Sequence, residues 1–198
     1  MIKTLIKSWV LCLGISHFSA QTKVIIETNK GNIELDLYED KAPKTVANFL
    51  RYVDEKTYDG TSFYRVVRLD NQPNSPIPIE VIQGGVQNDI LNLHSPIEIE
   101  TTQQTGLTHR VGAISMARLS PNSATTEFFI VVHQNQPQLD FGGKRNPDGY
   151  GFAVFGQVVK GMDVVEEIQK GETVMWENYG QKQLLKAPVQ IISIRRKE

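Results

Sequence analysis

Few side chains in this sequence have the types and spacing that covalent or metal-assisted chemistry requires. Neither HxH nor HxxxH spacing occurs among the four histidines, so no metal site is expected at His17, His94, His109 or His133. No serine occupies the G-x-S-x-G turn of a hydrolase. The paired glycines lack the G-x-G-x-x-G setting of a nucleotide-binding turn. The sequence therefore shows no sign of a nucleophile, a metal or a cofactor.

Arg65 is the charged residue with the most informative neighbours. It lies in SFYRVV, residues 62–67, a β-branched and aromatic run that predicts a strand. A lone arginine on a strand is usually one half of a surface ion pair. Its sequence context has to decide between that interpretation and a functional one.

Several blocks in the chain supply this context. SFYRVV is followed by IQGG at residues 82–85, by SMAR and SATTEFFI within residues 115–130, and by FAVFGQVVKGMDVVEEI at residues 152–168. In content and order these blocks resemble the cyclophilin-type peptidyl-prolyl cis-trans isomerases of the bacterial secreted or periplasmic type. The resemblance extends roughly from Lys23 to Arg195. It implies an enzyme that accelerates Xaa-Pro bond rotation in unfolded or extended polypeptides during protein folding.

The resemblance assigns the catalytic role to Arg65, and the chemistry explains why an arginine is needed. Rotation about an Xaa-Pro bond breaks amide resonance and meets a barrier of about 18–20 kcal/mol. The prolyl nitrogen accepts hydrogen bonds poorly while its lone pair is delocalised, and accepts them well once the bond is twisted. A donor directed at that nitrogen therefore stabilises the transition state more than either isomer.

The resemblance also implies a substrate groove around Arg65. Gln83 would orient the guanidinium, and the backbone of Ala117 and Arg118 would hold the substrate chain. A proline pocket would consist of Val81, Met116, Phe129, Leu139 and Phe152. Taken singly, each of these apolar residues is equally consistent with a barrel core.

Four positions depart from the family pattern. Glu80 stands where a pocket phenylalanine is expected, and Glu127 replaces the glutamine before Phe-Phe. Gln138 stands where an aromatic residue is common, and Phe152 replaces the histidine of eukaryotic members. We therefore hypothesise that Glu127, as part of the site, pairs with Arg65 and restrains it; the alternative is that Glu127 points to solvent. A related alternative is a non-catalytic proline-binding or chaperone module on the same barrel.

The elements that must position these residues are short strands separated by turn signals. A hairpin is expected from residues 24–28 and 33–38 around Asn29-Lys30-Gly31-Asn32. Further strands are predicted at residues 62–67, 81–83, 96–100, 113–117, 128–132, 153–159 and 189–194. Residues 101–109, 134–150 and 172–188 are polar and predict connections.

Two helices are expected. Pro43 suits a first helical turn, with Asp40 as a possible capping residue. The apolar stripe of the first helix would consist of Val46, Phe49, Leu50 and Val53. The second helix would be short and end before Gly171. Because no βαβ alternation is present, a parallel sheet is disfavoured. The pattern leaves a sandwich open, whereas the resemblance implies a closed antiparallel β-barrel capped by two α-helices.

The composition of the first twenty residues differs from that of the rest of the chain, which is expected to form a single domain. Lys3 and Lys7 precede a short apolar run that ends near Ala20, which predicts a secretory signal at residues 1–20. The only cysteine, Cys12, lies in this leader, so the isomerase domain at residues 21–198 has no thiol. The chain is 40% hydrophobic with a formal net charge of −1, and no basic face suggests nucleic acid. We expect a secreted or periplasmic monomer that needs no membrane once the signal is removed.

Overall fold

The structure is a computed structural model that describes residues 21–87, 94–177 and 180–197. The predicted signal at residues 1–20 lies outside the described residues. The elements, in chain order, are β1 Thr22–Thr28, β2 Gly31–Leu37, α1 Pro43–Asp54, β3 Ser62–Val67, η1 Leu69–Asn71, β4 Val81–Gly85, α2 Thr102–Thr105, β5 Ala113–Met116, β6 Phe128–Val131, η2 Pro137–Leu139, β7 Ala153–Lys160, α3 Met162–Gln169, β8 Thr173–Trp176 and β9 Gln181–Arg196.

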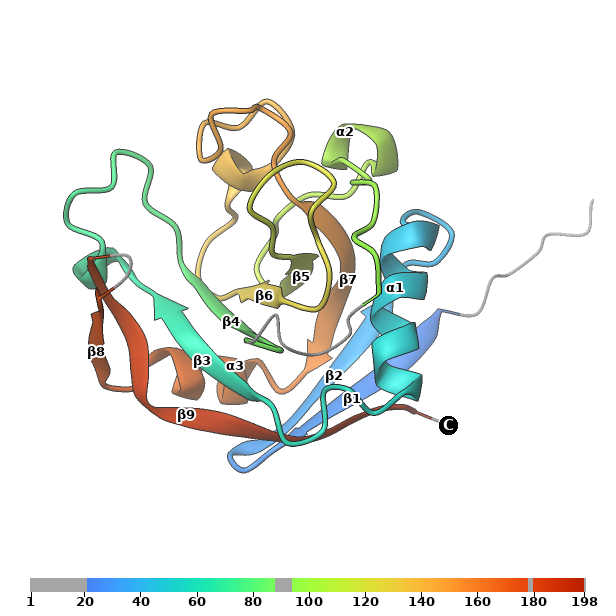
Figure 1. Cartoon of the computed structure of the whole chain (residues 1–198), viewed down its shortest axis with the longest axis horizontal. Helices are drawn as coiled ribbons and strands as arrows, with labels where there is room; N and C mark the ends of the chain where they lie inside the picture. Colours follow the sequence, from blue (N-terminus) through green and yellow to red (C-terminus); the bar gives the residue numbers. More distant parts are fainter. Residues whose placement is uncertain (1–20, 88–93, 178–179, 198) are drawn as a thin grey trace, which may run out of the picture.

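Eight of the strands form a closed antiparallel barrel (Figure 1). Their order is β1-β2-β7-β5-β6-β4-β3-β9, and pairing of β1 with β9 closes the ring. β9 is 16 residues long and has three partners: β8 near its N-terminal end, β3 in its middle and β1 near its C-terminal end. The closed antiparallel barrel is thereby confirmed, and the sandwich is excluded.

The first hairpin forms where the turn signal predicts it. Thr28 pairs with Gly31 across a turn at residues 29–30, and Gly31 has a φ of +134°, which glycine adopts at little steric cost. In β2, the alternate residues Ile33, Leu35 and Leu37 are fully buried. The period-two pattern of the sequence therefore sets which face of β2 meets the core.

Helix α1 begins at Pro43, as predicted, but its capping differs from the expectation. Asp40 does not cap it: the N-cap residue is Ala42, which has no side chain able to accept a hydrogen bond. Instead, the carboxylate of Glu100 accepts from the backbone N–H groups of Lys44 and Thr45, at 3.1 and 2.8 Å. A negative charge at this end of the helix also complements the helix dipole.

Both longer helices pack against the barrel interior. The predicted stripe of α1 is buried throughout, as are Val165 and Ile168 of α3. At the centre of this interior lies an aromatic cluster with ring centroids 5.1 to 5.7 Å apart, formed by Phe49, Tyr58, Phe63, Phe128 and Phe155. Aromatic pairs of this geometry contribute about 0.5–1.5 kcal/mol each beyond their burial.

Two stretches fold differently from the prediction. Residues 96–100 are not a strand: Ile97 makes a single bridge to Ala124. Residues 172–188 are not a mere connection, because they contain β8 and the first half of β9. The connection at residues 101–109 also includes α2, one helical turn with a capping box between Thr101 and Gln104. Among the described residues, none of the helices is both long and apolar enough to cross a membrane.

Candidate active site

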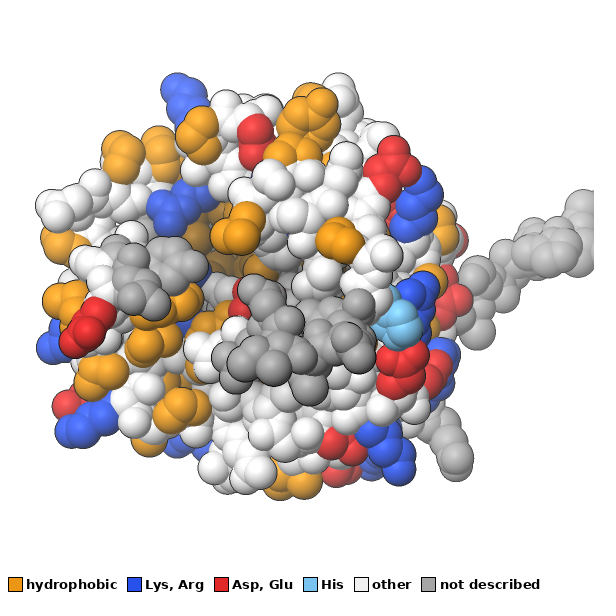
Figure 2. Space-filling view, viewed as in Figure 1, with side chains coloured by type: hydrophobic (Ala, Val, Ile, Leu, Met, Phe, Trp, Pro, Cys, Tyr) orange, Lys and Arg blue, Asp and Glu red, His pale blue; other side chains and the backbone are white. Residues whose placement is uncertain are grey.

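A groove of about 670 Å³ lies over the outer face of the barrel wall formed by β3, β4 and β6. Figure 2 shows it as a hollow with an apolar floor and basic side chains at its edge. Strand alternation separates the two sides of this wall. Ile82 and Phe128 belong to the interior cluster, whereas Val81 and Phe129 belong to a second apolar cluster. Members of that second cluster, Ile79, Val81, Phe129 and Leu139, line the groove and form its floor.

Four of the five predicted pocket residues are brought together in this floor. Val81 and Phe129 come from β4 and β6, Leu139 from η2 and Phe152 from the residue before β7. The rings of Phe129 and Phe152 meet edge to face with centroids 5.2 Å apart. Val81, Phe129 and Leu139 are at most 5% exposed. The floor is therefore a packed apolar surface suited to a small ring.

Met116 and Glu80 do not take the positions that the sequence suggested. Met116 is 1% exposed and belongs to the interior cluster, because it points to the side of β5 opposite Ser115. It is not among the residues that line the groove. Glu80 is likewise not among them, whereas the neighbouring Ile79 contributes its apolar side chain.

Arg65 lies at the edge of the apolar floor and is held by two amide side chains. Its Nη1 donates to Oε1 of Gln83 at 2.7 Å, which places Gln83 as predicted. Its Nε and Nη2 both donate to Oε1 of Gln183, at 3.0 and 2.7 Å. The guanidinium carbon lies 5.5 Å from the ring centroid of Trp176. The guanidinium is thus fixed from β4, β8 and β9.

Glu127 lines the groove and acts on the same network. One carboxylate oxygen accepts from the hydroxyl of Tyr64 at 2.6 Å, and the other accepts from Nε2 of Gln83 at 3.2 Å. Burial, followed by the charge of Glu127, raises the pKa of Tyr64 well above its ordinary value, so the phenol stays protonated. Glu127 therefore orients the amide of Gln83, whose oxygen faces Arg65. The direct pairing of Glu127 with Arg65 stays a prediction.

Ala117 and Arg118, whose backbone was expected to hold the substrate chain, both line the groove. Each of them is also engaged in contacts within the protein. The backbone N–H of Ala117 donates to the carbonyl of Glu127 at 2.8 Å, within the barrel wall. The Arg118 side chain is 2% exposed and makes a bidentate ion pair with Asp148, in which Nη1 and Nη2 donate to the two carboxylate oxygens at 2.8 and 2.9 Å. Its guanidinium carbon lies 5.2 Å from the ring centroid of Phe152. The side chain of Arg118 thus builds a wall of the groove.

A buried polar cluster supports the floor from behind. His109 stacks on Phe129, with ring centroids 5.8 Å apart, and its Nδ1 lies 2.7 Å from Oδ1 of Asp140. Nε2 of His109 lies 3.1 Å from the hydroxyl of Ser115. Burial lowers the pKa of His109, although Asp140 opposes this shift. Ser115 is fully buried, so this Ser-His-Asp arrangement is closed to a substrate.

No metal-binding group of acidic, histidine or cysteine residues occurs within residues 21–87, 94–177 and 180–197.

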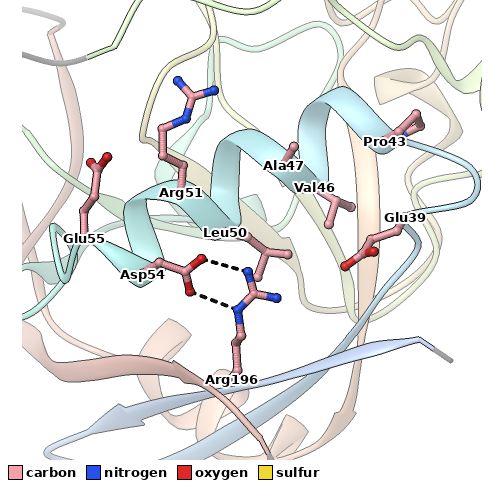
Figure 3. Close-up of a pocket in the computed structure, with 9 residues that line it drawn as sticks. All are labelled: Glu39, Pro43, Val46, Ala47, Leu50, Arg51, Asp54, Glu55 and Arg196. Carbon is pink, nitrogen blue, oxygen red and sulfur yellow. Dashed lines mark hydrogen bonds and ion pairs between the residues drawn. The ribbon is translucent and has the colours of Figure 1, made fainter.

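A second hollow, of about 660 Å³, lies along the outer face of α1 (Figure 3). Its main polar contact is an ion pair in which Arg196 donates to both oxygens of Asp54, at 2.9 and 2.8 Å. The hydrogen bonds to Arg196 lower the pKa of Asp54. This pair joins the end of β9 to α1.

Sequence reasoning missed three residues of this groove and its support: Tyr64, Trp176 and Gln183. Tyr64 sits beside Arg65 within SFYRVV, so its position alone could have drawn attention to it. Trp176 and Gln183 lie in the stretch that was expected to be a connection, and no sequence signal linked them to Arg65.

Comparisons with known proteins agree with this geometry. Residues 23–196 match the family described as cyclophilin type peptidyl-prolyl cis-trans isomerase/CLD. A peptidyl-prolyl cis-trans isomerase of Acinetobacter baylyi is 40% identical over 92% of this chain and 89% of its own length. Peptidyl-prolyl cis-trans isomerase B of Escherichia coli is 37% identical over 74% of this chain and 83% of its own length.

A likeness among solved structures supports the fold. A Cryptosporidium parvum cyclophilin type isomerase matches with a TM-score of 0.68 and 21% identity, over 90% of this chain and 99% of that one. A second crystal structure of that protein was obtained in the presence of the dipeptide Ala-Pro. With an apolar floor beside a fixed arginine, a closed barrel and relatives consistently named as isomerases, the chain belongs to the cyclophilin-type peptidyl-prolyl cis-trans isomerases.

Proposed function

We propose that the groove binds an extended polypeptide with a proline ring on the apolar floor, while Arg65 donates a hydrogen bond to the prolyl nitrogen. The observation that carries this proposal is the guanidinium of Arg65, held by Gln83 and Gln183 in the groove that Phe129 lines. The relative crystallised in the presence of Ala-Pro also supports it. Since the groove opens on the outer face of the barrel, we infer that its substrates are exposed segments of unfolded or extended proteins.

Catalysis in this scheme needs no covalent step. The floor holds the proline ring while the preceding carbonyl rotates, which breaks the amide resonance and localises the nitrogen lone pair. The fixed guanidinium donates to that lone pair as it forms. Because its hydrogen-bond partners hold it in place beforehand, little reorganisation is required at the moment of reaction.

A pair of matched peptides tests the groove. Catalytic amounts of the protein should accelerate cis-trans exchange in Ala-Ala-Pro-Phe, measured by NMR exchange spectroscopy. In a titration, backbone amide shifts should change in β4, β6 and η2. Ala-Ala-Ala-Phe should leave those amides unshifted, because it has no ring to fill the floor. Equal binding of both peptides, or an unaccelerated proline peptide, would contradict the proposal.

We also propose that the protein is exported as a secreted or periplasmic isomerase whose mature chain begins near Gln21. The support is the leader itself, in which two lysines precede a short apolar run. Mass spectrometry of the protein from its native cells should find residues 1–20 removed from the exported fraction. Recovery of the protein from the cytosol with Met1 retained would refute this location.

A further inference from the structure

The anchoring of Arg65 is shared unequally between its two amide partners. Gln83 accepts one hydrogen bond from the guanidinium, whereas the single oxygen Oε1 of Gln183 accepts two. The side of the guanidinium that carries Nε and Nη2 is thereby tied to β9. An arginine held along one side in this way keeps the plane of its fork fixed relative to the groove.

Gln183 is itself held in one orientation. It is fully buried, and its Nε2 donates to the backbone carbonyl of Asn71 at 3.3 Å. Asn71 is fixed in turn, because its side chain donates to the carbonyl of Val66 at 3.0 Å and accepts from the N–H of Arg68 at 2.8 Å. With its nitrogen engaged by η1, the amide of Gln183 presents its oxygen to Arg65.

The β8–β9 hairpin adds a second restraint on the same side chain. Trp176 of β8 lies beside the guanidinium, 5.5 Å from its carbon, and its ring meets that of Tyr64 edge to face at 6.4 Å. Trp176 also lines the groove. An outer strand of the sheet and the first half of β9 thus reach the catalytic side of the barrel wall.

We propose that Gln183 is a positioning residue for the isomerase reaction: it holds the guanidinium of Arg65 in the orientation that suits the twisted prolyl nitrogen. This inference rests on the proposed function of Arg65. If Gln183 acts on an interaction formed in the transition state, its loss should lower kcat while leaving KM nearly unchanged. A purely structural role would instead lower stability without affecting kcat of the folded protein.

Gln183→Met tests the proposal, because methionine has a similar length but offers no strong acceptor to Arg65. The matched control is Gln169→Met. Gln169 is 2% exposed in α3 and donates to the backbone carbonyl of Val67 at 3.3 Å, so its loss also removes a buried amide. In both variants, kcat and KM are measured with Ala-Ala-Pro-Phe well below the unfolding temperature. We expect Gln183→Met to lose about tenfold in kcat with KM within twofold of wild type, and Gln169→Met to keep wild-type kinetics.

Two further measurements separate positioning from stability. In an Arg65→Ala background, Gln183→Met should cause no further loss of activity, because the group that it positions is gone. In wild type, the Nε–H signal of Arg65 should be protected from solvent exchange in ¹⁵N NMR spectra, and Gln183→Met should abolish that protection. If Gln183→Met does not fold, Gln183→Asn, which withdraws the amide by one methylene group, carries the same expectations.

The outcomes distinguish this proposal from the one on which it rests. If Arg65→Ala is inactive while Gln183→Met has the kinetics of Gln169→Met, only the role of Gln183 is overturned. If Arg65→Ala keeps wild-type activity, the proposed function fails, and the role of Gln183 fails with it.

Discussion

Replacing Arg65 with alanine is expected to lower kcat/KM for an Ala-Pro peptide by about 10²–10³-fold, because one preorganised donor in an active site supplies about 3–4 kcal/mol of transition-state stabilisation. The loss should appear mainly in kcat, since the apolar floor that binds the proline ring stays in place. Arg65→Lys should recover little of this activity. A compact ammonium group cannot bond Gln83 and Gln183 in one plane and still present a donor at the groove.

The same substitution should also cost stability, which the sequence alone did not suggest. A lone arginine on a strand usually belongs to a surface ion pair, yet Arg65 donates to the side-chain amide oxygen of the fully buried Gln183. Leaving that oxygen unpaired costs about 1–3 kcal/mol. Activity must therefore be measured well below the unfolding midpoint, with circular dichroism as a check of the fold.

Arg68→Ala provides the control for Arg65→Ala. Arg68 follows the same strand, and its Nη1 donates to the backbone carbonyls of Gln169 and Gly171 at 2.6 and 2.9 Å, away from the groove. The Arg68→Ala variant should be less stable than wild type but keep the wild-type kcat/KM. A loss of activity equal to that of Arg65→Ala, or an Arg65→Ala variant within threefold of wild type, would show that the proposed mechanism is wrong.

The residues that the family resemblance assigned to the groove lie in short, contiguous motifs, which is why the sequence could name most of those that line it. Arg65, Val81, Gln83 and Phe129 sit on strands that the sequence predicted, and a period of two fixes their relation to their immediate neighbours. The alternating pattern could not decide which of two adjacent residues on a strand faces the groove. Met116 shows the consequence: the strand around it was predicted correctly, but the residue points into the barrel interior.

The parts that depend on distant pairing were not predictable in the same way. Trp176 belongs to β8, which has only four residues, TVMW, and Gln183 lies in the first half of β9, QKQLLKAP, where apolar and polar residues do not alternate, so neither stretch was marked as a strand. The pairing of β9 with β3 brings together residues more than a hundred positions apart along the chain, and β8 reaches the site by pairing with β9. Glu100 illustrates the same limit, since its capping of α1 joins segments that local sequence does not relate.

Glu127→Gln is expected to raise kcat/KM by about fivefold, equivalent to about 1 kcal/mol. The carboxylate of Glu127 is linked to Arg65 through Gln83, whose Nε2 donates to it and whose Oε1 accepts from the guanidinium. A nearby negative charge stabilises the guanidinium before the reaction and so weakens its donation to the prolyl nitrogen. Glu127→Gln removes this charge but keeps an oxygen that can accept from the hydroxyl of Tyr64.

Because the gain in kcat/KM from Glu127→Gln acts through Arg65, it should vanish in a variant that lacks Arg65. In a double-mutant cycle, Glu127→Gln should leave the residual activity of Arg65→Ala unchanged. Tyr64→Phe provides a comparison, since it removes the 2.6 Å hydrogen bond to Glu127 and the 2.8 Å hydrogen bond that the Tyr64 hydroxyl accepts from Nε2 of Gln83, while leaving the charge of Glu127 in place. It should not raise kcat/KM. Added salt should reduce the difference between Glu127→Gln and wild type, because screening weakens interactions between partly exposed charges. Equal activities of Glu127→Gln and wild type at low salt would show that Glu127 does not restrain Arg65, and would leave its contacts with Tyr64 and Gln83 as purely structural.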